Sequence, residues 1–227
     1  MIMINLSQGR NTSQGLLGVK IKSNIAAVVE LNCETDFVAR NGKFVSLLDN
    51  IATMCVKKIV SDPEHKEGKT RISKEQVAAI TVEDGKTLAD MVALNIGQIG
   101  ENIALGGVTV FKAGPGVKLS GLSHPSSGNP DLGKLQFGRH VAVMAYSSGI
   151  GGILPEGITD TELARQVCQH IIGMAPNSIE DENDKENSLL HQPFLLDEDV
   201  KVGQVVKISG MEIIDFVRSE VGRGDSD

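Results

Sequence analysis

The sequence predicts an α+β fold of two related subdomains, in each of which helices cover one face of a small antiparallel sheet. In both halves, short apolar runs of strand length come before segments whose apolar residues recur at helical spacing. A stretch rich in Gly, Pro and Ser separates the halves. We therefore expect a lead-in segment at 1–16, a first core subdomain at 17–113, a linker or long loop at 114–131, and a second core subdomain at 132–227.

The first half begins as a hairpin followed by a long helix. Residues 17–22 and 25–31 are apolar runs on either side of Ser23 and Asn24, which predicts two strands around a tight turn. Asn41 is a suitable N-cap for the helix that follows. The apolar stripe of this helix, spaced at three and four, consists of Phe44, Leu47, Leu48, Ile51, Cys55 and Ile59.

Two short helices and a strand complete the first half. Ser73 and Gln76 stand at capping-box spacing, which predicts a helix over 73–80. Thr87 can cap another helix. Its inward positions are Leu88, Met91, Val92 and Ile96. Residues 102–112 then have the pattern of a strand.

The second half repeats this order. Residues 132–137 and 141–146 predict a second hairpin, and Thr159 and Glu162 stand at capping-box spacing before a second amphipathic helix. The stripe of this helix consists of Leu163, Val167, Ile171 and Met174. Residues 211–221, which follow Gly210, resemble a closing strand.

Two further segments carry no recognisable chemistry. Residues 180–186 are mostly acidic, and we expect a mobile surface loop there. They lack the glycine and the final glutamate of a calcium loop, so we expect no metal site. The glycines at 149–152 lack the Lys-Ser/Thr of a phosphate loop and predict a turn at the end of a hairpin. We therefore expect no cofactor.

Charge and hydropathy exclude two classes of partner. The 227-residue chain has a net charge of −7 and no basic stripe beyond Lys57 and Lys58, so we expect no direct nucleic-acid partner. No apolar run approaches the ~20 residues of a membrane-spanning helix, so we expect no membrane insertion. The N-terminus has neither the apolar core of a secretory signal nor the Arg- and Ser-rich pattern of a mitochondrial presequence.

The three cysteines, Cys33, Cys55 and Cys168, are too few and too widely spaced for a disulfide framework or a Cys-x-x-Cys zinc site. A thiol enzyme would need Cys33 beside a histidine, but none of the five histidines stands in a local signature. We expect Cys33 to be a small buried residue. The sequence therefore indicates no catalytic residue and no enzyme, with a Cys–His site as a distant alternative.

The strand-to-helix corner at 32–41 is the most informative stretch of the chain. It contains Phe37, one of six phenylalanines in a chain with one tyrosine and no tryptophan. Corners of this kind lie at the surface, where an aromatic side chain preceded by an acid could insert into a partner. The alternative is that Phe37 plugs the domain's own core, because large apolar side chains are usually buried. The residue pattern alone favours the alternative.

The corner reads Asn-Cys-Glu-Thr-Asp-Phe-Val-Ala-Arg-Asn, which closely resembles the signature of the translation elongation factor Ts family. Members of this family are guanine-nucleotide exchange factors for elongation factor Tu. The resemblance continues at 99–103 and 216–224, and the segments 169–176 and 192–196 look most like the mitochondrial branch. It covers nearly the whole chain.

The resemblance implies a mechanism at the 32–41 corner. Phe37 would insert between two helices of the GTPase domain and Asp36 would hold a polar contact beside it, so that the Mg²⁺ and nucleotide site is disrupted and GDP is released. We expect Thr35 and Val38 to set the corner, and Arg40 and Asn41 to serve the helix start or the interface. The supporting residues of the corner are thus Thr35, Val38, Arg40 and Asn41.

The resemblance also implies a partner and a compartment. The partner would be elongation factor Tu, in a 1:1 or higher-order complex, and the compartment would be the mitochondrial matrix. The family normally begins with a small helical domain that helps to grip the partner, and this chain is expected to start downstream of it, with 9–16 resembling the segment before the first strand. The alternative function is a non-exchanging scaffold or chaperone-like binder of the same GTPase.

Overall fold

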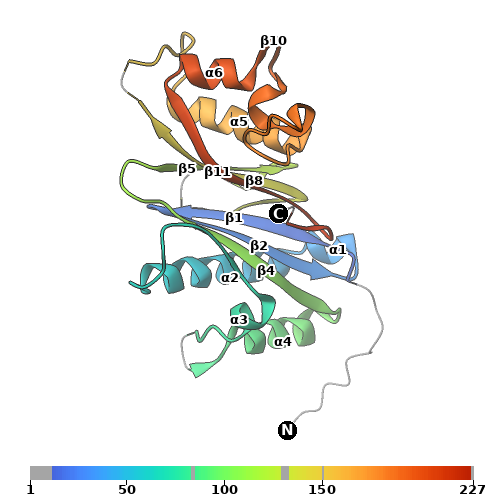
Figure 1. Ribbon diagram of the computed structural model, residues 1–227. Helices are drawn as coiled ribbons and strands as arrows, with labels where there is room; N and C mark the ends of the chain where they lie inside the picture. The colour runs from blue at the N-terminus through green and yellow to red at the C-terminus, as the bar shows by residue number, and fades with distance from the viewer. Residues whose placement is uncertain (1–11, 83–84, 129–132, 150, 226–227) are drawn as a thin grey trace.

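The computed structural model describes residues 12–82, 85–128, 133–149 and 151–225. It is an α+β protein, as predicted, in which two antiparallel sheets lie face to face and helices cover the outer side of each (Figure 1). Within these ranges, every helix is too short or too polar to cross a lipid bilayer. Most of the expected lead-in segment lies outside the described residues, and the first strand begins within it, at Gln14.

The first half contains β1 (Gln14–Lys22), β2 (Ile25–Cys33), α1 (Asp36–Ala39), α2 (Gly42–Val60), β3 (Gly68–Ile72), α3 (Lys74–Ala78), α4 (Leu88–Ile99) and β4 (Ile103–Lys112). The second half contains β5 (Lys118–His124), β6 (Ser127–Gly128), β7 (Gln136–Gly138), β8 (His140–Ser148), α5 (Asp160–Met174), the 3₁₀ turns η2 (Lys185–Asn187) and η3 (Leu189–His191), β9 (Pro193–Phe194), β10 (Asp197–Lys201), α6 (Val202–Ile208), β11 (Met211–Glu220) and β12 (Gly224–Asp225).

The predicted helix starts are confirmed by their hydrogen bonds. The side chain of Asn41 accepts from the N–H of Lys43 at the start of α2. The capping boxes of α3 and α4 are complete, and Thr159 caps α5. Every member of the predicted α2 stripe is buried. Met174 is an exception in α5: it was expected on the inward stripe but is exposed, because it is the last residue of the helix.

The two sheets share one strand arrangement. The first has the order β3-β4-β2-β1-β7-β6 and the second the order β12-β11-β8-β5. The hairpin predicted at 17–31 is confirmed, since β1 and β2 pair in one continuous register that ends with Lys22 opposite Ile25. In both sheets a central strand, β2 or β8, lies between the first strand of its half, β1 or β5, and the last long strand of that half, β4 or β11.

The second predicted hairpin is wrong. Strand β7, within 132–138, pairs with β1 of the first sheet, whereas β8 pairs with β5 and β11. The expected linker at 114–131 contains β5, which is the true partner of β8. The glycines at 149–152 follow β8 but do not close a hairpin, because β8 runs on to α5 and not to a neighbouring strand.

A close approach of the sheets explains why β5 looked like a loop. A Cβ atom at Gly121 would lie 2.9 Å from Cγ1 of Val19 and 3.1 Å from Cδ1 of Ile21, both on β1 of the other sheet. A glycine in a strand marks such approaches. One glycine of the stretch that was expected to be a linker is therefore a strand residue that lets the two sheets approach each other.

Three apolar layers hold the molecule together. One lies between α2, α4 and the first sheet, one between the two sheets, and one between the second sheet and α5 and α6 (Figure 1). The layer between the sheets consists of Leu17, Val19, Ile21, Ala26, Val28, Phe111, Val141, Val143, Ala145, Val217 and Val221. At its edge Lys69 Nζ lies 2.9 Å from Asp215 Oδ1, and the N–H of Gly222 donates to Glu30 at 2.9 Å. The two halves therefore meet through a continuous apolar interface with polar ties at the rim.

Candidate partner-binding corner

The 32–41 corner lies at one end of the first sheet, where β2 ends and the one-turn helix α1 leads directly into α2 (Figure 1). Helix α1 has four residues and a complete N-cap: the hydroxyl of Thr35 accepts from the N–H of Val38 at 3.3 Å. Thr35 was expected to set the corner, and it does so through this local hydrogen bond. Asn41, which follows α1, caps α2.

Phe37 projects from α1 into solvent. Its side chain is 82% exposed, the largest value for a large apolar residue among those described. The two residues after it take the inward positions, since Val38 and Ala39 are buried in the core below α2. Because one helical turn cannot point three consecutive side chains inward, burying Val38 and Ala39 directs Phe37 outward. The alternative that Phe37 plugs the core is wrong.

A charged pair flanks the exposed ring. Arg40 Nη2 lies 3.5 Å from Asp36 Oδ2, at the i,i+4 spacing, and both side chains are exposed. Exposed pairs of this kind are weak and screened by salt. Asp36 is therefore within easy reach of another partner, and Arg40 competes for it only weakly.

The corner is also tied to a distant segment that the sequence did not indicate. The hydroxyl of Thr35 donates to both carboxylate oxygens of Glu101, at 3.0 and 3.2 Å. Glu34 accepts from the N–H of Asn102 at 3.2 Å. Both partners lie in the turn between α4 and β4, within the 99–103 segment noted for its resemblance to the family. The strand register could have indicated this tie, because Cys33 lies opposite Ile103.

The cysteines are buried, as expected. The thiol of Cys33 donates to the carbonyl of Thr35 at 3.1 Å, and burial, with a contribution from nearby Glu101, raises its pKa to about 11. Burial raises the pKa of Cys55 and of Cys168 to about 12. The thiolate is the reactive form of cysteine. Their raised pKa values favour the neutral thiols at neutral pH, which disfavours the Cys–His alternative.

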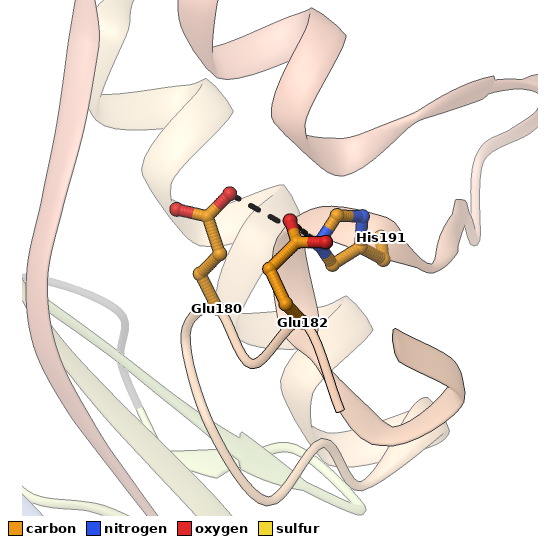
Figure 2. A group of neighbouring side chains, drawn as sticks. All are labelled: Glu180, Glu182 and His191. Carbon is orange, nitrogen blue, oxygen red and sulfur yellow. Dashed lines mark ion pairs between the residues drawn. The ribbon is translucent and has the colours of Figure 1, made fainter. Parts of the chain in front are cut away.

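The acidic stretch 180–186 contributes the group of side chains in Figure 2. Nε2 of His191 lies 3.9 Å from Oε1 of Glu180 and 3.7 Å from Oε1 of Glu182. Glu182 also pairs with Lys185 at 2.7 Å, and the hydrogen bond from Lys185 holds the pKa of the Glu182 carboxyl below its usual value. The three potential ligand atoms lie within 4.8 Å of one another. Both carboxylates are exposed and one is shared with a lysine, so the group is best described as a surface ion-pair network.

The chain as a whole resembles one family of proteins. The family model for elongation factor TS matches residues 34–184. A relative from Aedes aegypti is 37% identical over 229 residues, which cover 95% of this chain and 71% of the relative. A relative from Drosophila melanogaster is 38% identical, with 94% and 69% coverage, and one from Homo sapiens is 34% identical, with 96% and 68% coverage. All three are named mitochondrial elongation factor Ts.

Proposed function

This chain belongs to the elongation factor Ts family, and on that premise we propose that it is a guanine-nucleotide exchange factor that binds elongation factor Tu and promotes GDP release during translation elongation. Its relatives carry mitochondrial names, and we assign the chain to the mitochondrion with them. The observation that supports the site is the exposed ring of Phe37 within the family signature.

The proposed action is mechanical. Phe37 enters a gap between two helices of the GTPase domain and displaces one of them, while Asp36 makes a polar contact beside it. Mg²⁺ demands near-octahedral geometry at about 2.0–2.1 Å, so a small displacement of a ligand-bearing element weakens the site. GDP then leaves unchanged. The factor itself forms and breaks no covalent bond.

The energy available from one ring is sufficient for a measurable effect. Burying a phenylalanine side chain contributes roughly 1.5–3 kcal/mol, which corresponds to a factor of about 10 to 150 in an equilibrium constant. This energy promotes release only if the open state of the GTPase binds the factor better than the closed state does. By linkage, bound GDP weakens the binding of the exchange factor to the GTPase by the same ratio. GTP can then displace the exchange factor and recycle the GTPase.

The other corner residues support Phe37 in this scheme. Thr35 and Val38 set the conformation of α1, one as its cap and the other through burial. Asn41 starts α2. Asp36 must give up its exposed pair with Arg40 to contact the partner, which costs less than about 1 kcal/mol. We propose that the chain acts in a 1:1 or higher-order complex with elongation factor Tu.

A stopped-flow experiment tests this proposal. Elongation factor Tu loaded with fluorescent GDP is mixed with the chain, and we expect Phe37→Ala to slow the stimulated release tenfold or more. Leu94→Ala is the matched control, since Leu94 is another exposed large apolar residue of the first half, on α4. Unchanged stimulation by Phe37→Ala would exclude the mechanism.

The nucleotide content of the purified complex separates exchange from scaffolding. An exchange factor isolated together with its partner holds it free of GDP. A complex that forms but retains GDP, with no acceleration of release, would favour the non-exchanging binder.

A further inference from the structure

We infer that Glu101 is a positioning residue for nucleotide exchange, because it holds Thr35, and through it the turn of α1 that carries Phe37. This inference rests on the proposed function. Glu101 lies in the turn between α4 and β4 and touches neither Phe37 nor Asp36 through any hydrogen bond in the described part of the chain. Its effect on the partner would therefore be transmitted through the corner.

Side chains continue the β2–β4 ladder into the corner. The backbone pairing of β2 with β4 ends with Cys33 opposite Ile103. One step further in the same antiparallel register, Glu34 accepts from the N–H of Asn102, and one step beyond that, Thr35 donates to Glu101. The ladder is thus extended by two carboxylates where the backbones diverge. These side-chain hydrogen bonds keep the register of the sheet, since Glu34 bonds to Asn102 and Thr35 to Glu101.

The hydrogen bonds of the Thr35 hydroxyl show how Glu101 is connected to α1. A hydroxyl has one proton to donate. The N–H of Val38 is a donor, so Thr35 Oγ accepts there, and its own proton must go to Glu101. A hydrogen bond to a carboxylate polarises the hydroxyl and strengthens it as an acceptor for Val38. Glu101 therefore strengthens the cap of α1 and fixes its orientation at once.

Helix α1 depends on such support. It has four residues, and a single helical turn is unfavourable to form without outside contacts. Two anchors are present: the burial of Val38 and Ala39, and the Thr35 cap. Phe37, being exposed, makes no comparable contribution to its own position. Removing Glu101 loosens the cap and leaves the ring less well placed for entry into a narrow gap.

The backbone of Glu101 is held between two regular elements, α4 and β4. Helix α4 ends at Gly100, whose φ of 85° is left-handed and whose N–H donates to the carbonyl of Ile96 at 2.8 Å. A glycine in this conformation ends helices with little strain. Glu101 follows at once, so its backbone is fixed by α4 on one side and by β4 on the other. A push on Phe37 from the partner is then resisted by α4.

A double-mutant cycle tests the inference by stopped-flow release of fluorescent GDP from elongation factor Tu. We expect Glu101→Ala to slow stimulated release about fivefold or more, with an intact fold by circular dichroism, as the loss of a charged hydrogen bond at the cap implies. In the Phe37→Ala background, the same change should have almost no further effect, because there is no ring left to position. Glu101→Gln should retain most of the activity, since its amide oxygen can still accept from Thr35.

Glu30→Ala is the control, because it also removes a carboxylate that accepts a hydrogen bond, in this case from the N–H of Gly222, but lies away from Thr35. If Glu101→Ala fails to fold, Thr35→Val and Thr35→Ser carry the same test, one without the hydroxyl and one with it. Wild-type rates in Glu101→Ala, or a full additional loss in the Phe37→Ala background, would overturn the inference. No stimulation by the wild-type chain would instead overturn the proposed function.

Discussion

The two halves of the molecule build the same core and finish it differently at one corner. The order β4-β2-β1 in the first sheet matches β11-β8-β5 in the second, and in both halves the central strand leads into the long covering helix. Both connections are hydrogen-bonded to the segment before the last long strand of their half, where a glycine has a left-handed conformation: Gly100 before β4 and Gly210 before β11. The fold therefore offers the same support twice.

The difference lies in how the connection is tied. In the second half backbone groups make the tie, since Gly149 donates to the carbonyl of Gly210 at 2.7 Å and Ile153 to that of Ile208 at 2.8 Å. In the first half the carboxylates of Glu34 and Glu101 make it, and the backbone is free to form α1. The shared scaffold therefore sets where an exposed residue can lie, and the side-chain hydrogen bonds at the cap determine whether that residue lies on an ordered helical turn.

The largest expected effect separates the exposed phenylalanine of the first half from its buried neighbour. Phe44 of α2 is fully buried, so Phe44→Ala should lower the free energy of unfolding by about 3–5 kcal/mol. Phe37→Ala should change it by less than about 0.5 kcal/mol, as expected of a surface site. Urea unfolding followed by circular dichroism measures both. Comparable losses would mean that Phe37 is structural after all.

Moving the aromatic ring to the second half tests whether the two connections are equivalent. Ile153 occupies the corresponding connection of the second half and is 73% exposed. If an exposed aromatic were sufficient, the double variant Phe37→Ala/Ile153→Phe would recover exchange. We expect its stimulated GDP release to stay tenfold or more below wild type, because the described part of that connection contains no helical turn to present the ring.

Stopped-flow release measures this outcome, with Ile153→Phe alone as the control. Substantial recovery in the double variant would show that the two corners are equivalent to the partner.

A smaller effect should distinguish the halves by pH. In the second half His170 is buried and neutral: its Nδ1 accepts from the N–H of Leu195 at 3.1 Å, so Nε2 carries the proton and donates to Gln192 at 2.9 Å. Burial lowers the pKa of His170, which the bond to Gln192 only partly offsets. Below pH of about 6.5 the unfolded chain takes up a proton that the folded chain does not, so stability falls as pH falls.

Urea unfolding at pH 7.5 and 5.5 measures this loss, for which we expect at most about 1.4 kcal/mol, the linkage value of one proton over one pH unit below the unfolded pKa. In His170→Gln the pH dependence should weaken. His140→Gln is a comparison variant, since burial also lowers the pKa of His140. An unchanged slope in His170→Gln would assign the pH dependence to other groups.

Local signals account for what the sequence predicted. The caps at Asn41 and Thr87 and the stripe of α2 are set by residues a few positions apart, so they could be read directly. The errors concern contacts between distant segments. Nothing near 132–138 shows that β7 pairs with β1, and the glycine content of 114–131, Gly121 included, favours a linker unless the opposing sheet is known.

In the candidate site, too, local features could be predicted from the sequence and contacts between distant segments could not. The corner and the part of Thr35 in setting it were predicted, whereas the one-turn helix α1 was not, and the outward direction of Phe37 depends on the burial of Val38 and Ala39 in the core below α2. Glu101 is 66 positions from Thr35 in sequence, and only the assembled sheet brings them together.

The smallest expected effects compare the ion pairs at the two helix starts. Arg40 pairs with Asp36 within one turn of α1, whereas Lys118 of β5 pairs with Asp160, the first residue of α5, which also accepts from Ser148. The hydrogen bond from Lys118 lowers the pKa of the Asp160 carboxyl.

Arg40→Ala should lower the free energy of unfolding by about 0.3 kcal/mol, the value of an exposed i,i+4 pair. Lys118→Ala should cost more, up to about 1 kcal/mol, because it joins a strand to a helix across the sequence. Urea unfolding at 0.05 and 0.5 M salt measures both. A larger loss for Arg40→Ala would show that the local pair stabilises α1, and the capped corner would then owe its order to charge as well as to Thr35.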